Sequence, residues 1–596
     1  MIALTSRNLV QVFEDQVTRR GDATALTFKR GGSWQTMSWK ELGRRVRDVA
    51  DGLASLGVKP GDRVSILGDT SAEWIIADVA IMSAGAITVP IYQSNPAHEV
   101  QYVLQDAGSS WIFVDLDHQA AKIREEAAKL PDLKGVIRFF GDPEASHEHT
   151  LAAVENRGVA FRETNPGSHA ARVAAVKPSD PASYLYTSGT TGNPKGVVLT
   201  HGAWTYEAEA TAELELVKPD DVVLLFLPMA HSFAKVIEAV WFGQGATAAF
   251  VESIEKIVDN AGEVRPTVMP SVPRIFEKAY DAVLAKGLAT PGVKGWLFGL
   301  AMNGFEAWAD GKAKGMEVKT FGFKLGEKLV FPKLSAALSA RFGGRMRLFV
   351  SGGAPLSPKI NWFFTLLGFT ILEGYGLTET SAGTCVNRIG KNKIGTVGAP
   401  VPGTQVKIAE DGEILLKGPG VMKEYYRRPE ATAEMLKDGW LYTGDIGEVD
   451  ADGYVKITDR KKDLIKTSGG KYIAPQNLEN ELKGDPLISQ AVVHGDQRKY
   501  VTALITLSIE NARSWAAEQG LAEDEALHSH PKVKARIQQA VDALNAKQAS
   551  YSSIKKFVIL EIDFTQDRGE LTPTLKVKRK VVTERYKKVL DSMYTE

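Results

Sequence analysis

Hydrophobic positions in the first half of the chain alternate between a helical period and a strand-like run. After Ser38, apolar residues recur every three or four positions, on one helical face: Leu42, Val46, Val49, Leu53 and Leu56. This spacing predicts a helix that begins with a capping box formed by Ser38 and Glu41 and ends before Gly57. The turn Pro60-Gly61-Asp62 follows, and Val64–Leu67 then predicts a strand.

The same alternation continues along the chain. Asn95 and Pro96 suit the N-cap and the first residue of a second helix, which Gly108 ends before a strand at Trp111–Val114. Further strands are predicted at Val222–Leu227, Ala248–Val251, Thr267–Met269 and Leu348–Val350. Strands that alternate with helices indicate βαβ units and a largely parallel sheet. The fold class is therefore α/β.

The most apolar stretch, Trp74–Tyr92, contains Asp78 and breaks at glycine and proline. It predicts a buried helix followed by a strand rather than a membrane span. The N-terminus shows no basic region followed by an apolar segment, as a secretory signal has. We therefore expect a cytoplasmic protein.

The pattern changes after about residue 400. Val406–Ile408, Glu413–Leu416 and Tyr454–Ile457 are short alternating strands, and Asp-Gly turns suggest antiparallel hairpins. Beyond Arg460 helices and strands mix again, and lysine is frequent. We predict an N-terminal domain over residues 1–459, with a small β subdomain at about 400–459, and a C-terminal domain over 460–596.

Composition narrows the function classes. The 596 residues contain 72 Lys plus Arg and 72 Asp plus Glu, and this balance argues against nucleic acid as the main ligand. The one cysteine, Cys385, cannot form an internal disulfide, which fits a reducing compartment.

A glycine- and threonine-rich loop at Thr187–Gly196 follows the apolar run Ser183–Tyr186. Glycines allow backbone N–H groups to approach phosphate oxygens, hydroxyls add donors, and Lys195 adds a positive charge. The loop is not a Walker A motif, because Pro194 precedes the lysine and Gly196 follows it. It predicts a phosphate site of another kind.

This loop resembles the signature loop of the adenylate-forming superfamily, and four further motifs of that superfamily follow in order. They are the segments Glu373–Thr380, Tyr442–Asp445, Asp459–Lys466 and Leu571–Lys576. The segment from Asp438 to Lys462 is similar to the fatty acyl-CoA synthetase signature. The resemblance covers essentially the whole chain.

The resemblance implies a large adenylate-forming domain with parallel sheets flanked by helices, and a small mobile α+β C-terminal domain. The substrates it implies are ATP, an acid and CoA, with Mg²⁺ as the metal. An acid would react first with ATP to give an acyl-adenylate and pyrophosphate, and the CoA thiol would then displace AMP.

The residues that the resemblance assigns to the nucleotide are Thr187, Ser188, Gly189, Thr190, Thr191, Gly192, Lys195, Gly353, Ala354, Glu373, Gly374, Tyr375, Gly376, Asp445, Ile457 and Arg460. Tyr375 offers a flat face to adenine, and Asp445 accepts hydrogen bonds from the ribose hydroxyls. Thr378 donates to the α-phosphate. Glu379, with Thr190, holds the metal, since Mg²⁺ prefers oxygen ligands.

Further residues have implied roles in catalysis. A long ammonium side chain such as that of Lys576 can bridge the substrate carboxylate and the α-phosphate. His231 stands near the reacting carboxylate. Lys462 is the implied hinge, about which the C-terminal domain turns to exchange Lys576 for Lys466, Gly469 and Gly470 in thioester formation.

The substrate acid is the least determined part. The insertion Val283–Arg345, rich in aromatic and basic residues, is typical of long-chain members, and it suits either peripheral membrane contact or packing on the core. A homodimer also stays open. Two alternatives remain: a fatty acyl-AMP ligase or related ligase with another acid or acceptor, and a nucleotide-binding protein without catalysis.

Overall fold

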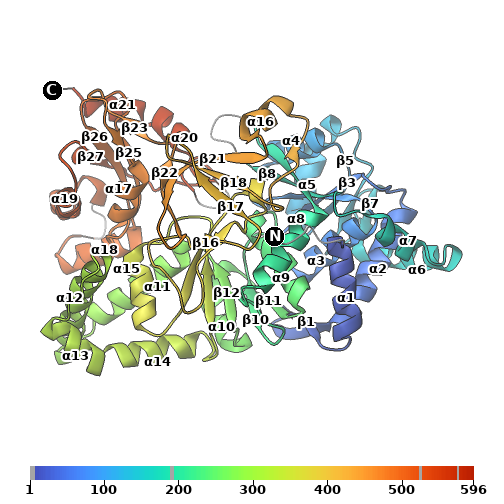
Figure 1. Ribbon diagram of the computed structural model, residues 1–596, viewed down its shortest axis with the longest axis horizontal. Helices are drawn as coiled ribbons and strands as arrows, with labels where there is room; N and C mark the ends of the chain where they lie inside the picture. The colour runs from blue at the N-terminus through green and yellow to red at the C-terminus, as the bar shows by residue number, and fades with distance from the viewer. Residues whose placement is uncertain (1–6, 188–192, 523–525, 573–575, 596) are drawn as a thin grey trace.

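The computed structural model describes residues 7–187, 193–522, 526–572 and 576–595. Within these residues the fold is α/β, with a large N-terminal part built on two mainly parallel sheets and a small C-terminal part. Figure 1 shows the elements that follow residue 460 gathered at one end of the molecule.

The first sheet has nine described strands, of which the central ones are parallel and the edge strands β2, β15 and β16 antiparallel. In spatial order they are β16 (Ala399–Pro400), β15 (Cys385–Val386), β14 (Ile371–Tyr375), β13 (Leu348–Ser351), β12 (Val268–Ser271), β10 (Val222–Leu225), β11 (Thr247–Phe250), β1 (Thr24–Arg30) and β2 (Ser33–Ser38). The carboxyl ends of β13 and β14 lead into predicted site residues, Gly353 and Gly376 among them.

The second sheet has eight described strands and includes, next to its edge strand β19, the antiparallel hairpin that brackets the glycine-rich loop. Its order is β19 (Glu424–Tyr425), β9 (Lys195–Thr200), β8 (Pro181–Thr187), β4 (Ile87–Ile91), β3 (Arg63–Leu67), β5 (Ser109–Val114), β6 (Gly135–Arg138) and β7 (Glu148–Thr150). Parallel pairing runs from β8 to β7, as the βαβ pattern predicted.

Helices fill the space between the two sheets. They comprise α1 (Leu9–Arg20), α2 (Trp39–Ser55), α3 (Ala72–Ser83), α8 (His201–Ala212) and α9 (Ser232–Gln244). One apolar cluster joins side chains of both sheets, such as Leu26 and Ile66, to Trp74 of α3 and Trp241 of α9. All residues of α3 are buried, and β4 follows it, which confirms the buried helix and strand predicted at Trp74–Tyr92.

The remaining helices of the N-terminal part are α4 (Ala97–Ala107), α5 (Asp117–Glu125), α6 (Leu151–Thr164), α7 (Ser168–Ala175), α10 (Ile257–Val264), α11 (Pro273–Leu288), α12 (Val293–Ala313), α13 (Phe321–Leu329), α14 (Phe331–Arg341), α15 (Pro358–Leu366) and α16 (Pro429–Met435). Of these, α12, α13 and α14 make up most of the insertion Val283–Arg345. Among the described residues, no helix combines the length and apolar character needed to cross a membrane.

A third sheet follows residue 400, where antiparallel hairpins were predicted. It consists of β17 (Gln405–Ile408), β18 (Glu413–Lys417), β21 (Trp440–Val449), β20 (Leu436–Lys437) and β22 (Val455–Arg460). The C-terminal part contains β23 (Ile465–Lys466), β24 (Tyr472–Ile473), α17 (Pro475–Leu482), β25 (Ile488–His494), β26 (Val501–Leu507), α18 (Ile509–Glu518), α19 (Pro531–Asn545), β27 (Ile554–Ile559), α20 (Arg579–Arg585) and α21 (Lys587–Ser592).

Two predicted helix starts need correction. Ser38 Oγ accepts from the Glu41 amide at 3.1 Å, but the Glu41 carboxylate bonds to Arg44 at 2.7 and 2.9 Å and does not complete the capping box. The second helix begins one residue later than predicted. Pro96 is the N-cap of α4, and its carbonyl accepts from the amide of Val100 at 3.1 Å.

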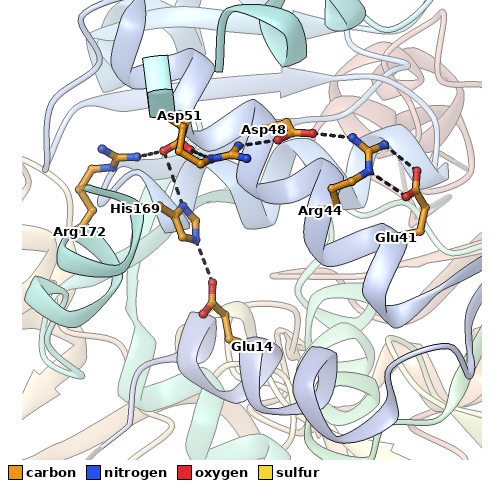
Figure 2. A network of polar contacts seen from close by, with 8 residues as sticks. Glu14, Glu41, Arg44, Asp48, Asp51, His169 and Arg172 are labelled. Carbon is orange, nitrogen blue, oxygen red and sulfur yellow. Dashed lines mark hydrogen bonds and ion pairs between the residues drawn. The ribbon is translucent and has the colours of Figure 1, made fainter. Parts of the chain in front are cut away.

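Buried carboxylates on α2 hold the N-terminal helices together (Figure 2). Asp51, fully buried, pairs with Arg172 of α7 and lies 4.0 Å from His169 Nδ1, while His169 Nε2 lies 2.9 Å from Glu14 of α1. Asp48 pairs with Arg44 at 2.6 Å in the same network. These pairs compensate the loss of hydration that a buried carboxylate suffers.

Candidate active site

The glycine-rich loop connects β8 to β9. Thr187 and Lys195 face each other as register partners in the last strand pair before the loop. Ser188, Gly189, Thr190, Thr191 and Gly192 lie outside the described residues. The Lys195 ammonium lies 5.2 Å from the centre of the Tyr425 ring, a cation–π distance. Lys195 therefore lies next to the Tyr425 side chain of β19.

A tight turn follows β14 and carries Thr378 and Glu379. Ser381 and Ala382 adopt positive φ angles of 54° and 70°, which non-glycine residues seldom do. A Cβ atom on Gly376 would lie 1.9 Å from the Ala382 carbonyl oxygen, so the turn closes only because residue 376 is glycine. Strained backbone of this kind tends to occur at functional sites.

Tyr425 ties this turn to the loop. Its hydroxyl donates to Glu379 Oε1 at 2.6 Å, and its ring faces Lys195. Glu379 is 9% exposed, and its second oxygen makes no hydrogen bond within the described residues. The sequence reasoning missed Tyr425, because it lies 46 positions from Glu379 in a segment without a motif that we had used.

Asp445 is at the centre of the predicted nucleotide site. It lies on β21 opposite Arg460 of β22, with Arg460 Nε 3.4 Å from Asp445 Oδ1. The Tyr375 hydroxyl donates to Asp445 Oδ2 at 2.6 Å. Burial raises the pKa of Asp445, while Arg460, Tyr375 and Lys576 act in the opposite direction. Two predicted residues, Tyr375 and Arg460, thus contact the carboxylate of a third, Asp445, and the positive charge of Lys576 also acts on this carboxylate.

Lys576 comes from the C-terminal part and lies within electrostatic range of Arg460, Asp445 and His231. The surrounding protein reduces its hydration, and the charge of Arg460 adds to the effect, so its pKa is lowered to about 8 although part of the side chain stays exposed. Buried Glu570 supports this segment by pairing with Arg585 at 2.9 Å.

His231 precedes α9 and caps it, since its Nδ1 accepts from the Phe233 amide at 3.0 Å. The proton of the neutral ring is therefore on Nε2. Burial and the charge of Lys576 lower the pKa of His231 to about 3. The next residue, Ser232, lies 3.3 Å from Thr378 between hydroxyl oxygens, which joins the histidine segment to the Thr378 turn.

Gly353 and Ala354 follow β13 and are exposed beside the same segment. Gly353 has φ +82°, and a Cβ on its neighbour Gly352 would lie 3.2 Å from the Phe233 ring. Glu373 supports this loop from β14 by accepting from the Leu356 amide at 3.4 Å and from Asn361 at 3.3 Å. Burial raises the pKa of Glu373 to about 7. Gly374 pairs with Val386 in the sheet.

Other predicted residues lie apart from this centre. Lys466, Gly469 and Gly470 belong to the exposed hairpin of β23 and β24, and among the described residues their segment bonds within the C-terminal part, as the Lys466 amide does to Asp496 at 3.0 Å. Lys462 is exposed in the turn after β22. Ile457 on β22 is half-buried against the main core.

Comparison with known proteins gives the same family for the whole chain. The model for the AMP-binding enzyme family matches residues 13–426, and that for the AMP-binding enzyme C-terminal domain matches residues 462–596. Long-chain-fatty-acid--CoA ligase FadD15 of Mycobacterium bovis is 39% identical over 98% of this chain and 96% of its own length. Long-chain-fatty-acid--CoA ligase 6 of Mus musculus is 32% identical over 99% and 87%.

Solved structures share the fold. The anthranilate CoA ligase AuaEII in complex with anthranoyl-AMP superposes with a TM-score of 0.74 at 21% identity, covering 98% of both chains. The Mycobacterium tuberculosis fatty acyl CoA synthetase superposes with a TM-score of 0.63 at 23% identity, covering 98% of this chain and 99% of that one. With matching family models over both parts of the chain, the protein belongs to the AMP-binding enzyme family.

Proposed function

We propose that the chain is an ATP-dependent ligase that joins a fatty acid to CoA through an acyl-adenylate. The observation that carries this proposal is that Lys576 lies within electrostatic range of His231 and of the Arg460–Asp445 pair, whose Nε and Oδ1 atoms are 3.4 Å apart. A carboxylate oxygen of the acid bonds to the α-phosphorus of ATP, and pyrophosphate leaves. The deprotonated thiol of CoA then bonds to the acyl carbon, and AMP leaves.

The adenylation step concentrates negative charge, so positioned cations and donors should dominate its catalysis. Lys576 bridges the acid and the α-phosphate, and Thr378 donates to the same phosphate. His231, a donor at Nε2, orients the acid carboxylate. Asp445 and Arg460 hold the ribose, and Tyr375 with the segment from Gly353 to Ala354 borders the adenine. The loop from Thr187 to Lys195 grips the pyrophosphate side.

We assign the magnesium site to Glu379, with Thr190 as the second protein ligand. Within the described residues no three His, Cys, Asp or Glu side chains converge as a metal cage. Mg²⁺ usually takes one or two protein oxygens and completes its shell with phosphates and water, and the second oxygen of Glu379 fits that role. The ion would neutralise phosphate charge. Tyr425 orients the carboxylate from its other oxygen.

For the second step we propose that the C-terminal domain beyond Lys462 turns as a unit about that residue and brings Lys466, Gly469 and Gly470 to the site. The apolar clusters support this boundary, because those of the C-terminal part begin at Ile465 and those of the N-terminal part end at Val455. Gly470, with φ +74° and open space around it, allows a close approach to the CoA arm.

The relatives named long-chain-fatty-acid--CoA ligase support a long-chain acid as the substrate. The test is CoA-dependent AMP release measured with acids from acetate to oleate and with aromatic acids, free CoA being the only acceptor. We expect an optimum among long chains. An optimum below octanoate would overturn the long-chain assignment, and acyl-adenylate without acyl-CoA would favour a ligase with another acceptor.

We further propose that the corner formed by α11, α12 and α13 contacts a membrane surface. Phe305 and Trp308 of α12 are buried in the core, whereas Val293 is 72%, Trp296 64% and Phe321 75% exposed. Lysines 286, 294, 319 and 324 accompany these apolar side chains and favour anionic lipid. In Figure 1 this corner lies at an edge of the molecule.

Co-sedimentation with vesicles containing phosphatidylglycerol tests this contact. We expect binding that weakens in Val293→Asp/Trp296→Ser and in high salt, with Val449→Asp, another exposed apolar site, as the control. Equal binding by all three proteins would exclude the corner as the contact. Loss of a dimer in the double variant, measured by sedimentation velocity, would instead assign the corner to a second copy.

A further inference from the structure

A buried ion cluster lies one helical turn beyond His231. The amide of Lys235 donates to the His231 carbonyl at 3.1 Å, so the two residues share the first turn of α9. Lys235 is only 1% exposed, and its ammonium bonds to Glu238 of α9 at 2.6 Å and to Asp78 of α3. The Trp74 ring of α3 lies 5.9 Å from the ammonium.

Helices α3, α8 and α9 each contribute a titratable group near the ammonium. Burial, together with the charge of Asp78, raises the pKa of Glu238 to about 8. Burial lowers the pKa of Lys235, but the two carboxyls outweigh it and the net shift is upward. His201 of α8 stays neutral, because burial and the charge of Lys235 lower its pKa to about 3. The Lys235 ammonium is thus buried between the carboxyls of Asp78 and Glu238.

A buried ion pair of this kind contributes more to fixing the position of one helix against another than to the free energy of unfolding. Helix α9 is apolar on almost all sides and packs between the sheets, so apolar contacts alone define its rotation and axial position weakly. Buried ion pairs gain little net stability, and their best-attested use is to select one register. The bond from Lys235 to Asp78 ties α9 to α3 near the N-terminus of α9, where His231 and Ser232 lie.

We propose that Lys235, through its ion pair with Asp78, is a positioning residue for the adenylation step: it sets where His231 and Ser232 stand relative to Thr378 and Lys576. The proposal rests on the proposed function. It assigns no contact between Lys235 and the substrates. Its effect should therefore reach the reaction only through His231 and its neighbours.

The test uses the full chain and the two half-reactions. Lys235→Met leaves the buried Asp78 carboxyl without its partner, which threatens folding, so Lys235→Met/Asp78→Asn serves as the main variant because it removes both members of the ion pair. We expect it to fold, to lose ATP–pyrophosphate exchange by about 100-fold, the scale of a misplaced catalytic group, and to keep thioester formation from supplied acyl-adenylate within about twofold. Lys235→Arg, which keeps the ion pair, should lose less exchange than Lys235→Met.

A double-mutant cycle separates positioning from general stability. The variant that combines His231→Ala with Lys235→Met/Asp78→Asn should lose little more pyrophosphate exchange than His231→Ala alone. Asp51→Asn is the matched control, a fully buried carboxylate of α2 whose partners in Figure 2 do not include Lys235, and its effect should be additive with His231→Ala. Additive losses for the Lys235 pair, equal losses in both half-reactions or unchanged exchange would overturn the proposal. Absence of acid-dependent exchange in the wild-type chain would instead overturn the proposed function.

Discussion

The Tyr375 hydroxyl donates a hydrogen bond of 2.6 Å to Asp445 Oδ2, which joins the end of β14 to β21 across the proposed nucleotide site. The other oxygen of Asp445 faces Arg460 Nε at 3.4 Å. The carboxylate is therefore held from both sides before any ligand binds, and its remaining lone pairs are those that can accept from ribose. Tyr375 therefore offers its hydroxyl to Asp445, in addition to the flat ring that is predicted to face adenine.

We expect Tyr375→Phe to weaken ATP binding. A hydrogen bond to a charged group contributes about 1.5–3 kcal/mol, so the KM for ATP should rise by at least about tenfold. The pKa of Asp445 should also rise further, because one of the bonds that lowers it is lost. Tyr454→Phe, which removes an exposed hydroxyl bonded to the Lys391 carbonyl at 2.8 Å, is the control for pyrophosphate exchange kinetics. An unchanged KM in Tyr375→Phe would show that Asp445 is positioned without it.

Replacing Lys576 should separate the two half-reactions. Lys576→Ala removes the cation next to Asp445 and Arg460, so acyl-adenylate formation should fall by about 100-fold or more, as when a principal charge-stabilising group is lost. Formation of the thioester from supplied acyl-adenylate should stay near the wild-type rate. Lys578→Ala, two positions along, tests the assignment of register. Equal losses in both half-reactions of Lys576→Ala would contradict the role given to Lys576.

The pH dependence of adenylation should reflect the lowered pKa of Lys576. Because this pKa is about 8 in the free protein, the ammonium predominates below pH 8 and is lost as the pH rises through that value. The kcat/KM for pyrophosphate exchange, which reports the free enzyme, should therefore decline above about pH 8. Lys576→Arg keeps its charge and should move this decline upward, whatever its absolute rate. A flat profile to pH 9.5 in the wild type would contradict the prediction.

Much of the scaffold was predictable from the sequence because periodicity and glycine position depend on local structure. Strands such as β3 and β13 fall where the apolar runs placed them, within one residue at each end. The start of α4 was wrong by one residue, since Pro96 rather than Asn95 precedes the first helical residue and offers no side-chain cap. Local pattern does not decide between two adjacent residues that both favour the extended N-cap conformation.

The candidate site was predictable only where a motif marked it. Asp445 and Arg460 face each other on the neighbouring strands β21 and β22, Lys576 reaches them from a distant segment, and the family resemblance had assigned all three to one site. Tyr425 and Lys235 carry no such mark. Their roles depend on partners 46 and 157 positions away, and only tertiary packing brings those partners into contact. The proposed approach of Lys466 to the site would require the proposed rotation about Lys462, which local sequence pattern does not encode.

We expect Lys466→Ala to have the opposite effect to Lys576→Ala. Lys466 lies on the exposed β23–β24 hairpin with its ammonium 5.5 Å from the Tyr472 ring, away from Asp445. Pyrophosphate exchange should therefore stay within about twofold of wild type, while thioester formation from acyl-adenylate falls by about tenfold or more. Lys471→Ala, in the same hairpin, is the control for a general charge effect. A loss confined to exchange would contradict the proposed rotation about Lys462.

The closing of the turn after β14 predicts a severe effect for Gly376→Ala. The added Cβ would lie 1.9 Å from the Ala382 carbonyl oxygen, a backbone atom that moves only if the whole turn shifts. Such a shift carries Thr378 and Glu379 away from their partners Ser232 and Tyr425, so exchange should fall by about 100-fold, the scale for a misplacement of about 1 Å. Gly299→Ala, away from the site, is the control, because its Cβ would meet the nearest atom at 3.9 Å, an ordinary contact. Circular dichroism and thermal unfolding of both variants separate a local shift from loss of fold. Full activity in Gly376→Ala would contradict the prediction, because the turn would then accept a methyl group at residue 376 without displacing Thr378 and Glu379.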